Sequence, residues 1–404
     1  MKLRLREHEL STPVRLDDDV VDVLLQPDSP VELRPARRGK WTVRTGSMVG
    51  VVRVGNFELR IEPKIGLRNV LQLMEFDGGG ERWRTEADTF NHDEDLLIGF
   101  IRVFAATVDG ALRGGVRSDY RPQEERLVSP RGRIDFPATF CSALPTPLPC
   151  HFGEYTTNIE LNRHLRAAVE LALRIAGVPP PTALRLRHAL ANFDGVPGAR
   201  PDRHWYERWT PTRLDAHWRT SAALADQLLN GVSMSTSEGN RRGLSFLIDM
   251  NRLFERFVTE RLRRLLPPPF VLADQHRAHL DRAARIAIKP DLYIERDGEP
   301  FLVADLKYKL TTDGRPRNED SYQAVVYATA LGVKDAALIY HAEHPGDTAP
   351  TIAHIRHSPI RLHTWPIDLR GTKASIDEQL QALADGIVSL GVDSSHVHAS
   401  ASVR

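Results

Sequence analysis

Two aspartates and a lysine in the stretch KPDLYIERDGEPFLVADLKYKL (residues 289–310) have the types and spacing of a hydrolytic metal site. Asp305 and Lys307 are two residues apart in a predicted strand, so their side chains point to the same face of a sheet. If Asp291 lies beside them, its carboxylate and that of Asp305 repel each other unless a cation lies between them. Oxygen ligands of this kind suit Mg²⁺ or Mn²⁺, so Asp291 and Asp305 are the predicted metal ligands.

The chemistry that such a site supports is metal-assisted hydrolysis of a phosphodiester. A bound metal ion lowers the pKa of a water molecule and neutralises the charge that develops on the phosphate. Lys307 would stabilise that charge or orient the nucleophile. The alternative is an ordinary surface hairpin with an Asp/Lys pair. The apolar flanks FLVA and YIE favour the site, because they predict buried strands in which an unpartnered acid is costly.

Whether Asp291 joins the other two depends on the register of the predicted hairpin. Directly opposed residues of an antiparallel pair share a face, and a slip of one residue reverses it. A three-residue loop such as 297–299, or a compensating bulge, sets Asp291 opposite Asp305. A two-residue loop at Asp297-Gly298 alone does not.

The predicted elements around this stretch could hold such a site on a rigid sheet. From about residue 235 the patterns indicate helix, three strands, helix and strand, with the first helix spanning residues 241–264 and ending before Pro267. The first 75 residues alternate in short runs separated by Gly and Pro, which predicts a β-rich module. We expect an α/β protein of α+β multidomain type: a β-rich module (1–75), a mainly helical region (76–234), the sheet domain (235–390) and a disordered tail (391–404).

The composition indicates an ordinary globular protein but does not indicate a substrate. The chain has 404 residues and 41% hydrophobic content, enough for two or three ordinary domains. Lys and Arg number 54 against 53 Asp and Glu, so any affinity for nucleic acid must come from local patches. The first ten residues carry charges throughout instead of an apolar signal segment, and no apolar run reaches membrane-spanning length, so we expect a soluble, cytoplasmic protein without a membrane partner. Cys141 and Cys150 are too few for a disulfide framework; we expect reduced thiols, with a single bridge left open.

The pattern Pro290-Asp291 … Asp305-Leu306-Lys307 resembles the PD-(D/E)xK nuclease motif, and the predicted element order resembles that superfamily's αβββαβ core. Glu255, on the preceding helix, stands where many of these nucleases carry another acid. Gln323 and Tyr327 resemble the Q-x-x-x-Y element of the RecB-like branch. The resemblance therefore implies six catalytic residues; for Glu255, and for the Gln323/Tyr327 pair, a solvated or amphipathic helix face is the alternative.

A wider resemblance covers about residues 50–345. GNFELRIEPKIGLRNVLQLMEF, PRGRIDF, EYTTNIELNRHLRAAVELAL and MNRLFERFV, in that order, resemble the McrC family, the nuclease subunits of McrBC-type modification-dependent restriction systems. The resemblance implies cleavage of double-stranded, modified DNA in complex with a separate McrB-like AAA+ GTPase. The chain has no G-x-x-x-x-G-K-[ST] phosphate loop, which agrees with a motor on another chain. The role of engaging the motor would fall within residues 1–234.

Basic residues outside the motif offer weaker candidates. Arg131 and Arg133 in PRGRIDF could contact DNA or the motor, although a turn leading into a strand explains them equally well. The predicted helix 241–264 carries seven arginines and three acids and could follow phosphates or form a solvated face. HRAHL (276–280) has two histidines without the companions of a zinc site.

Three functions compete on this basis. The leading hypothesis is the DNA endonuclease subunit of a McrBC-like complex. The others are a stand-alone RecB-like nuclease or repair enzyme, and a catalytically idle assembly or activator subunit of a motor ring.

Overall fold

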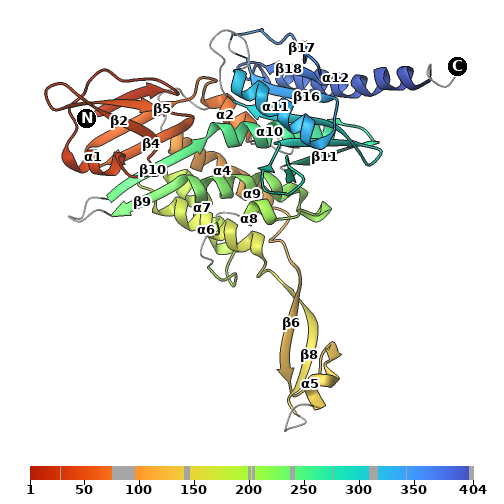
Figure 1. Ribbon diagram of the computed structural model, residues 1–404. Helices are drawn as coiled ribbons and strands as arrows, with labels where there is room; N and C mark the ends of the chain where they lie inside the picture. The colour runs from red at the N-terminus through yellow and green to blue at the C-terminus, as the bar shows by residue number, and fades with distance from the viewer. Residues whose placement is uncertain are drawn as a thin grey trace. The chain divides into compact units, whose positions relative to one another are not determined.

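A computed structural model describes most of the chain (Figure 1). The described residues are 1–27, 29–74, 96–140, 146–198, 202, 205–236, 242–274, 276–308, 317–342 and 344–399. Cys141 lies outside them, whereas Cys150 is a buried free thiol. Within this described part, no helix is both long and apolar enough to cross a membrane.

The chain folds as two units, each built from stretches that are not consecutive in the sequence. Unit 1 contains residues 1–76, 236–243 and 247–404, and unit 2 contains residues 77–235 and 244–246. The sequence predicted 1–75 and 235–390 as separate domains. In the structure these two stretches belong to one unit, and hydrogen bonds join residues some 300 positions apart within it.

The N-terminal part of unit 1 is built on a sheet in which β1, β5, β4 and β10 are neighbours in that order. β1 (Lys2–Arg6) pairs parallel with β5 (Phe57–Glu62), and β4 (Met48–Val54) pairs antiparallel with β5. The hairpin β2 (Val31–Ala36) and β3 (Lys40–Thr45) and the helix α1 (Asp18–Leu24) contribute to the same apolar core. The alternating buried and exposed residues of β5 are the period-two pattern that predicted strands here.

The C-terminal part of unit 1 contains a six-stranded sheet of order β11-β14-β15-β16-β18-β17. β14 is antiparallel to β11 and β15, β16 is parallel to β15 and β18, and β17 is antiparallel to β18. Strand bounds are β11 Phe270–Asp274, β14 Leu292–Arg296, β15 Glu299–Lys307, β16 Asp335–His341, β17 Thr351–His354 and β18 Arg361–Ile367. A small hairpin of β12 (Ala278–His279) and β13 (Ala287–Ile288) precedes β14.

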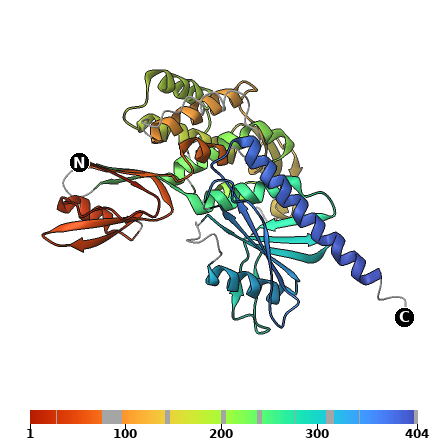
Figure 2. The same ribbon diagram turned by 90° about the horizontal axis from the view of Figure 1, so that it is seen from above.

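Helices cover both faces of this sheet (Figure 2). The helix α10 (Met250–Leu265) packs with α12 (Lys373–Ala399) on one face. The helix α11 (Asn318–Leu331) covers the other, where Ala324, Tyr327 and Ala328 join an apolar cluster with Val303 of β15. Side chains alternate between the two faces along β15, so its odd-numbered residues, like Val303, face α11.

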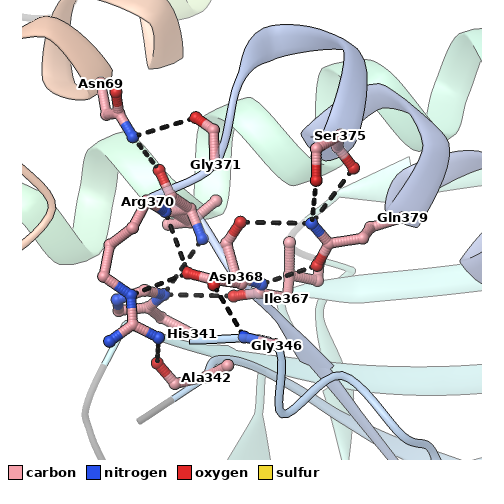
Figure 3. Close-up of polar contacts among 11 residues, drawn as sticks. Asn69, His341, Ala342, Gly346, Ile367, Asp368, Arg370, Gly371, Ser375 and Gln379 are labelled. Carbon is pink, nitrogen blue, oxygen red and sulfur yellow. Dashed lines mark hydrogen bonds and ion pairs between the residues drawn. The ribbon is translucent and has the colours of Figure 1, made fainter. Parts of the chain in front are cut away.

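A buried polar network joins the N-terminal part of unit 1 to the end of the C-terminal sheet (Figure 3). Asn69, on α2 (Leu67–Leu73), donates from Nδ2 to the carbonyl oxygens of Leu369 at 2.5 Å and Gly371 at 3.3 Å. In the same turn, Asp368 accepts hydrogen bonds from the Arg370 amide and guanidinium and from the Gly346 amide. The network ties α2 to the connection between β18 and α12.

Unit 2 is helical around a buried core, with a long β arm. Its helices are α4 (Leu96–Leu112), α6 (Glu160–Arg174), α7 (Pro180–Asn192), α8 (Trp205–Arg208), the 3₁₀ helix η1 (Arg213–Trp218) and α9 (Arg219–Gly231). The strands β9 (Val232–Thr236) and β10 (Arg242–Asp249) carry the chain back to unit 1. Phe100 of α4 packs against Phe246 of β10, with ring centroids 5.1 Å apart.

The arm consists of β6 (Asp119–Leu127) and β8 (Leu148–Thr156), which Figure 1 shows extending away from the helices of unit 2. β7 (Arg133–Ile134) and the short helix α5 (Phe136–Phe140) lie near its end. The sequence predicted a mainly helical region here and did not foresee the arm. β6 is exposed along most of its length and β8 is mostly half-buried without a regular alternation, so neither shows the apolar pattern that marks a half-buried strand.

Two further predictions differ from the structure. Residues 242–249, placed in a helix by sequence, form the strand β10, and the helix begins only at Met250, where the Asp249 side chain accepts from the amides of Asn251 and Arg252. The tail from residue 391, predicted to be disordered, continues α12 as far as Ala399, and residues 400–404 lie outside the described part.

Candidate active site

The β14–β15 hairpin sets the register on which the candidate site depends. Arg296 pairs with Glu299 across a two-residue turn in which Asp297 and Gly298 have φ of 56° and 82°, the left-handed values of a type I′ turn. This is the loop length that by itself gives the wrong register. A β-bulge between Ile294 and Glu295 corrects it, so that Leu292 pairs with Ala304. One step further along this register, Asp291 stands opposite Asp305.

Asp291, Asp305 and Lys307 come together on one face of the sheet. Asp305 and Lys307 share the parity of Val303, which packs against α11. The Asp291 carboxylate accepts a hydrogen bond of 2.8 Å from the backbone amide of Leu306. This bond places its carboxylate directly beside the Asp305-Leu306-Lys307 segment.

Asp305 is buried, and its contact with Lys307 is close. The Lys307 Nζ lies 2.6 Å from Oδ2 of Asp305, whose side chain is 2% exposed. The pair is an ion pair by distance, yet Oδ2 makes no hydrogen bond of good geometry within the described structure. The Lys307 side chain is 23% exposed, so the lysine is the more accessible partner of the pair.

The negative charge of the two aspartates is not fully balanced by the positive charge of Lys307. Burial, and then repulsion from Asp291, raise the pKa of Asp305 to about 7. Burial and the nearby Glu255 also raise the pKa of Asp291, although the Leu306 amide opposes this. Burial lowers the pKa of Lys307, but Asp305 and Asp291 outweigh it and raise that pKa overall. One lysine does not balance the acids.

Glu255 lies in the electrostatic field of the site. It projects from α10, and burial, followed by repulsion from Asp249 and Asp305, raises its pKa. Nevertheless, the described residues contain no group of three or more acidic, histidine or cysteine side chains placed to hold one metal ion. The pair Asp291 and Asp305 is therefore the candidate ligand set in this structure.

Gln323 and Tyr327 lie one helical turn apart on α11 and contact each other. The Gln323 Nε2 donates to the Tyr327 hydroxyl at 2.5 Å. Burial, together with the charges of Asp305 and Asp291, raises the pKa of Tyr327, while Gln323 opposes the shift. Both residues therefore stand on the face of α11 that is turned to the aspartates.

Sequence reasoning missed one further acid at this face. Asp320 on α11 is 9% exposed and contributes to the raised pKa of Lys307. It stands seven residues before Tyr327, hence on the same side of the helix. That spacing was the signal that could have identified it.

The other predicted contact residues belong to unit 2. The Arg131 guanidinium lies 4.7 Å from the centre of the Phe152 ring, and Arg133 is in β7, paired with His151. Gly132 between them has φ of 71°, and a Cβ there would lie 2.4 Å from the His151 carbonyl oxygen. Glycine is required here by backbone conformation and by close approach. The PRGRIDF motif thus has a structural role in the arm.

Comparison with known proteins identifies the family. A family model described as "McrBC 5-methylcytosine restriction system component" matches residues 43–341, more than half of the chain. The chain belongs to this McrBC family. No curated protein matches it.

One solved structure agrees at the level of fold. A chain from the refined half-complex of the tetradecameric assembly of Thermococcus gammatolerans McrB AAA+ hexamers with bound McrC is 18% identical to this McrBC-family chain, with a TM-score of 0.56. The match covers 96% of this chain and 100% of the other. A chain from the cryo-EM structure of the T. gammatolerans McrBC complex is 20% identical, with a TM-score of 0.43, covering 66% of this chain and 88% of that one.

Proposed function

We propose that this McrBC-family chain is a DNA endonuclease subunit that hydrolyses phosphodiesters with a PD-(D/E)xK site. The observation that supports this most is the convergence of Asp291, Asp305 and Lys307 on one face of the sheet, produced by a bulge that corrects the register. Glu255 and Tyr327 lie within electrostatic reach of the three, and Gln323 contacts Tyr327.

The residues fit a divalent cation. Asp291 and Asp305 stand opposite each other on the sheet, and burial, followed by repulsion between the two carboxylates, raises the pKa of Asp305 even with Lys307 2.6 Å away. A cation beside both carboxylates would remove that repulsion. Asp291 and Asp305 would hold Mg²⁺ or Mn²⁺, which when bound supplies an activated water and Lewis-acid neutralisation of the phosphate.

The chain's own residues define the rest of the site. The Leu306 amide orients the Asp291 carboxylate, and Asp305 holds the Lys307 ammonium, which would stabilise negative charge on a phosphate oxygen. Tyr327, which accepts a hydrogen bond from Gln323, lies on the α11 side of the site, close enough to feel the charges of Asp305 and Asp291. Glu255 adds negative charge near the aspartates, which favours a cation over an uncharged occupant.

We propose further that the chain acts with a McrB-like AAA+ GTPase carried on a separate polypeptide. The solved relative comes from an assembly of McrB hexamers with bound McrC, and this chain has no phosphate loop of its own. Modified double-stranded DNA is the proposed substrate, since the family is described as a 5-methylcytosine restriction system. The arm of unit 2 exposes Phe136 (59%) and Phe140 (84%), apolar surface that suits a protein partner.

The test is an Asp305→Asn variant in the reconstituted complex with the motor, Mg²⁺, GTP and a methylated plasmid. Loss of one metal ligand should lower the cleavage rate by about 10²-fold or more. Stimulation of the partner's GTPase should be unchanged, because that readout does not involve the carboxylate. Asp297→Asn, at the exposed turn of the same hairpin, is the matched control. Cleavage by Asp305→Asn at the wild-type rate would refute the assignment.

The lack of a third described ligand beside the aspartates favours one alternative, a catalytically idle activator of the motor ring. Calorimetric titration of the full chain with Mn²⁺ separates the two. The nuclease proposal expects binding that Asp305→Asn weakens, whereas an idle subunit would bind no Mn²⁺ and its complex would leave the plasmid intact. Cleavage without any NTPase would instead indicate a stand-alone nuclease.

A further inference from the structure

A short positively charged hairpin comes immediately before Asp291 in the chain. Residues 276–289, here called the basic hairpin, contain β12, β13 and the loop between them. They include the four cations Arg277, Arg282, Arg285 and Lys289 against one acid, Asp281. The whole chain is balanced, with 54 basic and 53 acidic residues, so this excess is local.

The acid closes the loop. The Asp281 Oδ1 accepts hydrogen bonds from the amides of Arg285 at 2.8 Å and Ile286 at 2.7 Å. The Leu280 amide donates to the Ile286 carbonyl at 2.9 Å, which continues the β12–β13 pairing. These bonds fix the backbone of the basic hairpin and direct its long side chains outward.

The base of the basic hairpin is anchored on the same face of the sheet as the candidate site. Ile288 is buried in the cluster that contains Tyr293, Val303 and Tyr327. The His276 ring stacks on the Tyr293 ring, with centroids 4.2 Å apart. Asp305 and Lys307 share this face, so the basic hairpin stands at the margin of the candidate site.

The cations of the basic hairpin are available to a ligand. Arg277, Arg282 and Lys289 are exposed and form no ion pair with any residue that the structure describes. The Arg285 side chain, which pairs with Asp281 at 3.2 Å, is still 81% exposed. Beside them, Leu280 and Ile286 are 39% and 51% exposed. The deoxyribose rings of DNA would offer these two side chains apolar contacts.

We propose that the basic hairpin binds the sugar-phosphate backbone of duplex DNA next to the phosphodiester that is cut. The proposal rests on the nuclease function proposed above and adds the element that positions its substrate. Arginine and lysine contacts to phosphates orient a protein on DNA without reading its sequence. An anchored cationic hairpin beside the paired aspartates would offset the repulsion between those carboxylates and the DNA.

The test measures binding without cleavage. The full chain is titrated into a fluorescein-labelled duplex of about 20 base pairs in EDTA, and anisotropy is recorded at several salt concentrations. Each phosphate contact contributes about 0.9 to the slope of log K against log salt. Arg277→Ala/Arg282→Ala should therefore reduce the slope by about 2, with affinity at least about 10-fold lower near physiological salt.

Arg15→Ala/Arg37→Ala, which removes two exposed arginines of the N-terminal part, is the matched control and should keep the wild-type slope. Asp305→Asn should also retain DNA binding while losing cleavage. Failure of the nuclease proposal therefore remains distinct from failure of this one. A wild-type slope in the hairpin variant, or no binding by the wild-type chain at about 50 mM salt, would overturn the proposal.

Discussion

At the scale of single residues, the structure contains a second buried acid whose charge matters. Glu7 is 1% exposed and accepts hydrogen bonds from the Lys64 amide at 2.9 Å and the Tyr308 hydroxyl at 3.1 Å. Its Oε2 has no hydrogen-bond partner in the described structure. Tyr308 directly follows Lys307 and stacks on His341, with ring centroids 5.6 Å apart. Glu7 thus contacts the end of the strand that carries the candidate site.

Glu7 should make stability depend on pH. Burial raises its pKa from 4.5 to about 7, so the folded state binds a proton that the unfolded state releases between these values. Stability contributed by this group is therefore lost as pH rises from about 4.5 to 7, by roughly 2–4 kcal/mol. We expect Glu7→Gln to lose less stability than wild type between pH 5 and 8 in denaturant unfolding. Glu62→Gln controls for removal of a carboxyl from the adjacent strand; an identical pH dependence in Glu7→Gln would contradict the prediction.

The candidate site shows what residue types can and cannot predict. The spacing of Asp305 and Lys307 and that of Gln323 and Tyr327 predicted shared faces, because helix and strand periods are fixed. The position of Asp291 was ambiguous, because the face of the sheet to which its side chain points depends on a β-bulge. No residue type in the hairpin makes a bulge necessary. The Glu7–Tyr308 contact joins residues 301 positions apart, a separation that one sequence does not reveal.

At the scale of elements, the β14–β15 hairpin makes the site sensitive to where a residue is removed. Phe301 is the extra residue of the bulge, between Pro300, paired with Glu295, and Leu302, paired with Ile294. Deleting Phe301 would give a regular hairpin with every later pair unchanged. Deleting Ala304 would move Asp305 opposite Leu292 and turn it to the other face.

We therefore expect the two single-residue deletions to differ in cleavage. The Phe301 deletion should keep most activity and lose about 1–3 kcal/mol from its contact with the Phe270 ring, 5.3 Å away. The Ala304 deletion should lose cleavage. Plasmid cleavage and thermal unfolding of both variants test this. An inactive but folded Phe301 deletion would show that the bulge itself, and not the register, forms the site.

The helices and strands that are buried in the structure were predicted more readily from the sequence than those that are exposed. The strands β15 and β16 were predicted because their buried apolar runs are strong and local, and the helix α11 because Ala324, Tyr327 and Ala328 recur at helical spacing. Residues 242–249 were assigned to a helix because Phe246 and Met250 also fit a helical stripe, although Phe246 and Ile248 alternate as strand residues do. The arm was missed because its strands pack against little else.

At the scale of the molecule, unit 1 is assembled from distant parts of the chain. Asn69 is 8% exposed and holds the turn after β18 through two carbonyl oxygens, as Figure 3 shows. Removing its amide would leave buried acceptors without donors, a cost of about 1–3 kcal/mol. The long separation means that this contact closes a large loop and stabilises the unit as a whole.

Asn69→Ala should therefore lower the free energy of unfolding of unit 1 by about 1–3 kcal/mol. Gln381→Ala, which removes an exposed amide bonded to Asp385 on α12 of the same unit, should change it by less than about 0.5 kcal/mol. Denaturant unfolding followed by hydrogen exchange in β15 measures both. Equal effects of the two variants would show that the Asn69 contact does not hold unit 1 together.

The bulge at Phe301 also has a consequence for how related chains are compared. Fourteen positions separate Asp291 from Asp305 here, and a regular hairpin with the same turn would need thirteen. A search for the motif that fixes one interval would discard chains of the other kind, although both present the same pair of carboxylates. An interval of thirteen positions and one of fourteen can thus place the two carboxylates equally well. They differ in whether the strand after the turn contains the extra residue of a bulge.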